Sequence, residues 1–315
     1  MKFRTEIKLP SYPFRVNYQT QIFGLGSCFV DHMKQKFDYF QFQNLINDFG
    51  VIFNPASINT LVERIINQNF YTPKDLFYHQ NVWKNFELHS SLNTADPEHL
   101  INQVNRKLKE NLSFIRQSDL IIFTLGTAWV YRHKKSGKIV ANCHKVAAKE
   151  FDKILLSPTE ITEILSNTIR LLKKENKKTK ILFSLSPVRH LKDGFIENQR
   201  SKAHLLTAVH ELVDYKNVFY FPSYEILMDD LRDYRFYKTD LIHPNEVAVE
   251  YIWNQLVGAL MDTPTKNLMK KVEKIRKSLD HKPFDKNSPD YKNHLQKINH
   301  QILQLQKDYP WMNFT

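Results

Sequence analysis

A chain of 315 residues with 42% hydrophobic and 13% aromatic residues can bury a large core, which excludes a disordered protein. Two cysteines, an N-terminus without the apolar core of a signal peptide, and no apolar run near the roughly 18 residues of a membrane span predict a cytoplasmic protein with no membrane contact. The net charge of +12 would suit nucleic-acid binding, but half of the excess lies after Thr263 among dispersed lysines, which favours solvated surface over a nucleic-acid partner.

Apolar β-branched runs alternate with longer amphipathic stretches along the chain. In chain order they predict a strand at 20–26, helices at 27–40, 55–69 and 97–117, a strand at 118–126, a hairpin around "KKSG" at 128–144, a helix at 157–178, a strand at 179–187, a helix at 197–213, a strand at 216–223 and a helix at 243–261. This alternation predicts an α/β fold, a three-layer α/β/α sandwich with a mostly parallel sheet.

A break at "DTPTK" (262–266) divides the chain into a predicted α/β domain, 1–262, and a C-terminal helical extension, 263–315. The extension reads as two polar helical stretches separated by "HKPFDKNSPD" (281–290). Short polar helices are marginal alone, so we expect this pair to pack on the core domain. A homodimer through the extension is left open. The apolar side chains at helical spacing that would supply the contact are Leu268, Val272, Ile275 and Leu279.

The first predicted strand ends in "FGLGSCF", where Gly24 and Gly26 precede Ser27. Ser27 would stand at a strand-to-helix turn, where free backbone N–H groups and the helix dipole favour negative charge. Two interpretations are open at this point. Ser27 is either a nucleophile whose oxyanion that environment stabilises, or the N-cap of the following helix.

A second motif, "KTDLIHPNE" (238–246), places Asp240 three residues before His243. A carboxylate this close to an imidazole can fix its tautomer and steady the imidazolium during proton transfer. The alternative is a surface turn that caps the next helix. The combination of Gly-x-Gly-Ser after the first strand with Asp-x-x-His before the last core helix favours catalysis.

The sequence resembles the GSCFA family, a branch of the SGNH (GDSL-like) hydrolase superfamily. The resemblance covers roughly residues 20–260. Its motifs stand here as "GSCFV" (26–30), "FGVIFNP" (49–55), "TLGTAWVY" (124–131), "NCHK" (142–145), "SPVRH" (186–190) and "DLIHPN" (240–245).

The resemblance implies a role for each matching residue. Ser27 would be the nucleophile, with Asp240 as orienter and His243 as general base, while the N–H groups of Ser27 and Gly50 would form the oxyanion hole. Ala128 stands where the superfamily has an oxyanion asparagine. An alanine side chain cannot donate, so Asn54, Thr127, Trp129 or Asn142 would have to replace it.

Of these four we favour Asn54, which lies on the loop that carries Gly50. Its alternative role is the N-cap of the helix that starts at Pro55.

Six further residues are expected to contact substrate: Thr127, Trp129, Asn142, His144, Arg189 and His190. Arg189 follows a strand end and suits a carboxylate or phosphate, although a structural ion pair is an equal alternative. Trp129 and Tyr131 form either hairpin packing or an aromatic platform for a sugar ring. His144 beside Cys143 lacks further ligands at metal-binding spacing, so neither a metal nor another cofactor is expected.

These residues predict a serine esterase or acyltransferase that acts on an acyl ester of a small molecule or carbohydrate. An O-acetylated carbohydrate is the substrate class that the superfamily suggests. The alternative is a non-catalytic carbohydrate- or metabolite-binding module that retains the pocket. The missing asparagine favours this alternative, and the presence of Ser27, Asp240 and His243 favours the enzyme.

Overall fold

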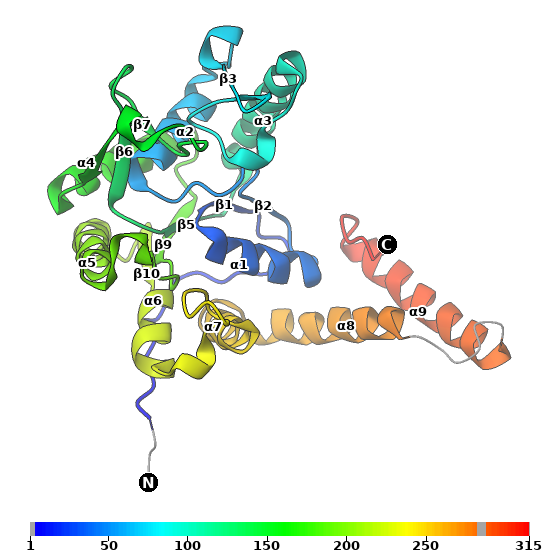
Figure 1. Cartoon of the computed structure of the whole chain (residues 1–315). Coiled ribbons are helices and arrows are strands. Elements are labelled where there is room, and N and C mark those ends of the chain that lie inside the picture. The colour runs from blue at the N-terminus through cyan, green and yellow to red at the C-terminus, as the bar shows by residue number, and fades with distance from the viewer. Residues whose placement is uncertain (1–3, 282–287, 315) are drawn as a thin grey trace.

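The computed structural model describes residues 4–281 and 288–314. Its centre is a five-stranded sheet in the order β10-β9-β5-β1-β2, in which every neighbouring pair is parallel. The expected α/β fold with a parallel sheet is therefore confirmed, and Figure 1 shows helices on both sides of it. The strands are β1 (Ile22–Gly26), β2 (Asn44–Ile46), β5 (Leu120–Leu125), β9 (Lys180–Leu185) and β10 (Val218–Phe221).

Each predicted core helix is present, with ends that differ by a few residues. Among the described residues, no helix is long and apolar enough to cross a membrane. The helices of the α/β part are α1 (Cys28–Tyr39), α2 (Pro55–Asn67), α3 (Pro97–Gln117), α4 (Pro158–Glu175), α5 (Phe195–Leu212), the short α6 (Ser223–Glu225) and α7 (Glu246–Leu260).

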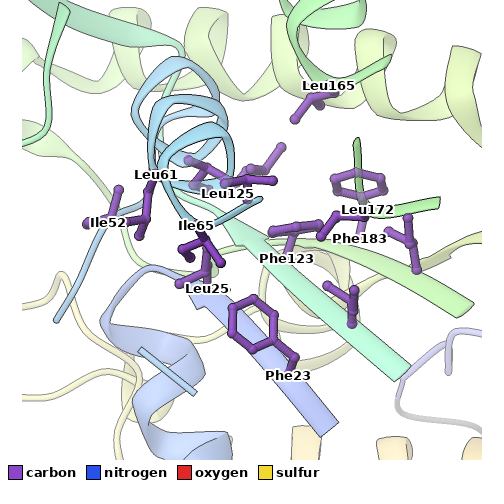
Figure 2. Packing of buried hydrophobic residues seen from close by; sticks show 14 of the residues in the cluster. Phe23, Leu25, Ile52, Leu61, Ile65, Phe123, Leu125, Leu165, Leu172 and Phe183 are labelled. Atoms are coloured by element: carbon purple, nitrogen blue, oxygen red, sulfur yellow. The ribbon is translucent and has the colours of Figure 1, made fainter. Parts of the chain in front are cut away.

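Side chains that alternate along each strand divide the core into two layers. Phe23 and Leu25 of β1 pack with α2, α3, α4 and α5 on one face, and Figure 2 shows them beside Leu61 and Ile65 of α2. Ile22 points to the other face, where it packs with α1 and α7. These two clusters make the three layers that the sequence predicts.

The predicted hairpin around "KKSG" is confirmed as β6 (Trp129–His133) and β7 (Ile139–Val140), which pair antiparallel. The sequence did not predict the third strand of this small sheet, β8 (Phe151–Leu155), nor the hairpin of β3 (Phe77–His79) and β4 (Val82–Lys84). The edge strand β2 also went unpredicted. Strands of three residues carry too little periodicity to be recognised from the pattern alone.

The C-terminal extension consists of α8 (Thr263–Asp280) and α9 (Pro289–Asp308), and residues 282–287 of the expected linker between them lie outside the described residues. In Figure 1, α8 leads away from the α/β body and α9 turns back toward α1. Val272 and Ile275 are buried in the hydrophobic cluster that also contains residues of α1 and α7, and Leu268 and Leu279 pack against it, so the expected contact with the core is confirmed. The domain boundary at residue 262 stays a prediction.

The close approach of β1 to β5 at Gly26 makes a test of the sheet. A Cβ at Gly26 would lie 2.5 Å from Thr124 O and 2.8 Å from Thr124 N, backbone atoms that cannot move away. We expect Gly26→Ala to lower the free energy of unfolding by roughly 1–3 kcal/mol. Gly258→Ala, in α7 with nothing within 4 Å of the new Cβ, should instead raise it by roughly 0.5–1 kcal/mol. Urea denaturation of both variants measures the contrast, and equal effects would contradict it.

Candidate active site

Ser27 lies between β1 and α1, at the carboxyl end of β1. Its Oγ accepts a hydrogen bond from Phe29 N at 3.3 Å, so Ser27 is the N-cap of α1. The residue is only 1% exposed. A hydroxyl that accepts a capping hydrogen bond can still act as a nucleophile, but Ser27 is buried in this structure.

The Asp240 and His243 side chains form the pair that their spacing suggests. His243 Nδ1 and Asp240 Oδ2 are 2.7 Å apart, and the N–H groups of Ile242 and His243 also donate to Asp240 Oδ1. These hydrogen bonds stabilise the carboxylate and lower the pKa of Asp240 to about 2. Both side chains are half-exposed. Asp240 is ionised at neutral pH, so its carboxylate can orient the imidazole of His243.

No hydrogen bond joins Ser27 Oγ to His243 among the described residues, so the structure brings together two of the three expected catalytic side chains. Both loops nevertheless lie at the carboxyl edge of the sheet. Ser27 follows β1, and the backbone of the Asp240–His243 loop accepts a hydrogen bond from Arg189 N, beyond the end of β9, through Ile242 O at 3.3 Å. In α/β sheets this edge is where ligands bind.

The three expected oxyanion donors are all engaged within the protein. Ser27 N donates to Thr124 O at 2.9 Å, and Gly50 N donates to Asn47 O at 2.7 Å. The Asn54 side chain accepts from Ser57 N and donates to Ser57 Oγ, which makes it the N-cap of α2. The capping alternative for Asn54 is thus the role that the structure supports, because both ends of its amide are bonded to Ser57.

A cavity of about 330 Å³ opens at the carboxyl edge of the sheet, and we call it the Trp129 cavity. Four of the six expected substrate contacts line it, together with the cap Asn54 and the apolar side chain of Phe53; these four are Thr127, Trp129, Asn142 and His190. The Trp129 indole is held in place, since its N–H donates to Glu197 O at 3.3 Å and Lys153 Nζ lies 4.3 Å from the ring centroid.

His190 links the Trp129 cavity to the Asp240–His243 pair. Its ring stacks on Phe53 at 5.3 Å, and both rings lie against the space where Gly126 has no side chain. Burial, with smaller contributions from the charges of Lys202 and His243, lowers the pKa of His190 to about 3. The imidazole is therefore neutral, and its Nε2 is a buried polar atom without a partner in the described part of the chain. It offers the cavity one hydrogen-bonding group.

The other two expected contacts lie elsewhere. His144 is buried, with Nε2 2.7 Å from Asn85 O and its backbone N–H donated to Asn142 Oδ1, so it holds its own loop together rather than facing the cavity. Arg189 lines a different cavity, although it is the neighbour of His190 in the chain. Groups of three or more metal-ligating side chains do not occur in the described ranges.

Lys202 was not predicted as a site residue; it lies on α5 yet is only 1% exposed. Its Nζ donates to Gly126 O at 2.8 Å and to Ser186 O at 2.7 Å, and so ties together the chain segments that leave β5 and β9. Burial lowers the pKa of Lys202 to about 7. A neutral amine has two N–H donors, which matches the two carbonyl acceptors. A lysine within an amphipathic helix is usually a surface residue, so no sequence pattern would have identified this one.

The sequence model described as the GSCFA family matches residues 21–256, about three-quarters of the chain. The chain belongs to the GSCFA family. A second model, described as the C-terminal domain of GSCFA domain proteins, matches residues 272–315. No curated protein matches the sequence.

The GSCFA chain is also similar to solved structures, at low identity. One is a carbohydrate esterase family 3 protein from Talaromyces cellulolyticus, with 7% identity, a TM-score of 0.35, and coverage of 81% of this chain and 99% of the other. Another is the acetyl xylan esterase Est2A from the rumen bacterium Butyrivibrio proteoclasticus, with 11% identity, a TM-score of 0.38, and coverage of 81% and 65%. We draw no functional argument from similarity at this level.

The capping geometry of Asn54 makes a prediction about stability. Asn54→Ala removes the acceptor of the Ser57 N–H and should lower the free energy of unfolding by about 1 kcal/mol. Asn54→Asp keeps that acceptor, so it should retain most of the capping contribution. Urea denaturation of the two variants measures the difference. Equal stability of Asn54→Ala and the unaltered protein would contradict the capping role.

The buried Lys202 predicts a pH dependence. Its pKa is about 7 in the folded protein, whereas an unfolded lysine titrates near ~10.4. Between these values the unfolded chain binds more protons, so this residue makes the free energy of unfolding rise with pH. Lys202→Met should flatten that rise between about pH 7 and pH 9, by up to about 1.4 kcal/mol per pH unit. Urea denaturation across this range measures the slope. Lys178→Met, at an exposed lysine, should keep the original slope, and parallel slopes for all three proteins would refute the assignment.

Proposed function

We propose that this GSCFA protein is a serine esterase or acyltransferase of the SGNH type, with Ser27 as nucleophile, His243 as general base and Asp240 as its orienter. The observation that carries the proposal is the 2.7 Å contact between His243 Nδ1 and Asp240 Oδ2. It places the proton of a neutral imidazole on Nδ1 and leaves Nε2 as the acceptor that a serine base requires. Ser27 lies at the same sheet edge, at the start of a helix that favours developing negative charge.

The reaction follows from these roles. His243 Nε2 takes the Ser27 Oγ proton as the oxygen attacks the acyl carbonyl carbon, and the resulting oxyanion forms near the N-terminus of α1. Collapse of this intermediate expels the alcohol, which leaves with the proton from His243. Water or an acceptor hydroxyl then attacks the acyl-enzyme by the reverse sequence and releases Ser27.

The Trp129 cavity is the proposed substrate site. Its volume of about 330 Å³ suits a small acylated molecule, and its walls combine aromatic rings with the neutral, unpartnered Nε2 of His190. An O-acylated carbohydrate fits this mixture of flat apolar surface and hydrogen-bonding groups. The oxyanion requires Ser27 N to exchange its bond to Thr124 O for one to substrate, since catalytic hydrogen bonds are often formed only in the complex.

A second candidate is a carbohydrate- or metabolite-binding module that uses the Trp129 cavity without chemistry. The observation that favours it is the closure of Ser27, which is 1% exposed and whose backbone N–H is already donated. The absence of an asparagine at Ala128 points the same way.

Labelling with a fluorophosphonate probe separates the two functions. The enzyme predicts that the unaltered protein is labelled, that Ser27→Ala is not, and that Ser27→Ala lowers kcat for an activated acetyl ester by at least about 10³-fold. His243→Ala should cause a similar loss. Ser157→Ala is the matched control, because Ser157 also N-caps a helix, α4, but lies in no expected catalytic role. An unlabelled protein with intact fold would leave the binding module as the function.

A further inference from the structure

A second cavity, of about 420 Å³, shares no lining residue with the Trp129 cavity. We call it the Arg189 cavity. Its walls come from the segment after β9, from α5, and from the stretch between α6 and residue 237. The residues that the argument uses are Arg189, Arg232, Asp229, Asp233, Tyr234 and Tyr237.

Arg189 lies against two neighbouring tyrosine rings, whose centroids are 6.0 Å apart. Its guanidinium carbon is 4.1 Å from the ring centroid of Tyr237 and 5.3 Å from that of Tyr234. A hydrogen bond to the Tyr237 side chain uses part of the guanidinium, and its five N–H donors leave others for a ligand. No carboxylate in the described ranges pairs with Arg189, so the structural ion pair considered from the sequence is not its role.

Arg232 is the second cation of the cavity, and its backbone conformation is unusual. It follows a π-helix, Ile226–Leu231, and adopts a left-handed conformation with φ 41°, its N–H donated to Leu227 O at 3.0 Å. π-helices are rare and often found at functional sites, and a left-handed arginine costs conformational energy. This local geometry turns the chain at the edge of the cavity. The Arg232 side chain is exposed and has no ion-pair partner among the residues described.

The carboxylates of the cavity do not neutralise these two cations. Asp233 is already engaged, because it accepts from Arg235 N at 2.9 Å and lies 3.7 Å from the Arg235 guanidinium. Asp229 is exposed on the π-helix and is the one other carboxylate in the lining. With Arg235 counted beside Asp233, three guanidinium groups and two carboxylates give the groups in and around the cavity a formal charge of +1, next to two tyrosine rings.

The geometry points to the Arg189 cavity as a binding site for the anionic group, a phosphate or a carboxylate, of a small molecule that carries a flat ring. Guanidinium groups bind both anions through paired N–H donors, and the tyrosines supply apolar area for the ring. This inference is independent of the proposed function, because none of its residues takes part in the Ser27 reaction. The inference assigns Arg189 to a ligand other than the substrate proposed for the Trp129 cavity.

The site is connected to the Asp240–His243 loop through the backbone. Arg189 N donates to Ile242 O, one residue before His243, and Tyr237 precedes the loop by three residues. A ligand held by Arg189 and Tyr237 therefore fixes one residue that is bonded to the segment carrying His243 and another that precedes this segment in the chain. A ligand in the Arg189 cavity would affect the conformation of the Asp240–His243 loop whether or not Ser27 is a nucleophile.

Isothermal titration calorimetry at fixed ionic strength tests the assignment with three probes: inorganic phosphate, phenyl phosphate and benzoate. Phenyl phosphate should bind most tightly, since it provides both the anion and the ring. Arg189→Gln should weaken its binding about tenfold or more, because the charge-assisted hydrogen bonds are lost while side-chain length is nearly kept. Tighter binding of benzoate than of phenyl phosphate would assign the carboxylate as the anion.

Arg232→Gln and Arg200→Gln complete the design. Arg232 is exposed, so its variant is expected to fold, and it should also weaken phenyl phosphate binding severalfold. Arg200 is an exposed arginine on α5 that lies outside the cavity, and its substitution makes the same change in net charge. Binding to Arg200→Gln should stay within about twofold of the unaltered protein. Equal weakening in all three variants, or no binding of any probe to the unaltered protein, would overturn the inference.

Discussion

The candidate site depends on the close approach of β1 to β5. The two strands pair in parallel along five residues, and at Gly26 the Thr124 backbone leaves no room for a side chain. This contact fixes Ser27, whose N–H is donated to the same Thr124 carbonyl. Only glycine at residue 26 permits the two strands to pair this closely. The positions of α1 and of the groups at the carboxyl edge depend on that pairing.

The buried Lys202 also fixes the chain segments at the carboxyl edge of the sheet, in addition to the contact of β1 with β5. Its amine donates to carbonyls that follow β5 and β9, and Ser27 N, which follows β1, donates to Thr124 O of β5. The segments that follow these three neighbouring strands are therefore held by hydrogen bonds as well as by side-chain packing. A buried lysine without a carboxylate partner is costly unless it loses its proton. Burial also keeps His190 neutral, because it disfavours the imidazolium. The carboxyl edge thus combines neutral buried bases with an exposed, charged Asp240.

Two consecutive residues, Arg189 and His190, face different cavities. Alternation of side chains beyond the end of β9 gives one side of the loop an apolar aromatic pocket with a neutral imidazole, and the other a cationic pocket with two tyrosines. The Asp240–His243 loop is bonded to Arg189 through the backbone, so it is fixed to the same segment that separates the two cavities.

The sequence favoured an oxyanion role for Asn54 and a nucleophilic role for Ser27, with capping only as the alternative for each. What it determined by itself is the fold class, the core strands and helices and the Asp240–His243 pair. These features depend on periodicity and on contacts a few residues apart, which a linear pattern records. The short strands β2, β3 and β4 escaped it, and so did Lys202, the partners of His144, and the division of Arg189 from His190. Those depend on atoms brought together from distant segments: the buried Lys202 amine donates hydrogen bonds to the carbonyls of Gly126 and Ser186, and the Ser27 N–H donates to Thr124 O of the neighbouring strand. Only the tertiary structure decided which polar groups are already satisfied and which remain free for a ligand, because hydrogen-bond partners far apart in the sequence leave no local signal.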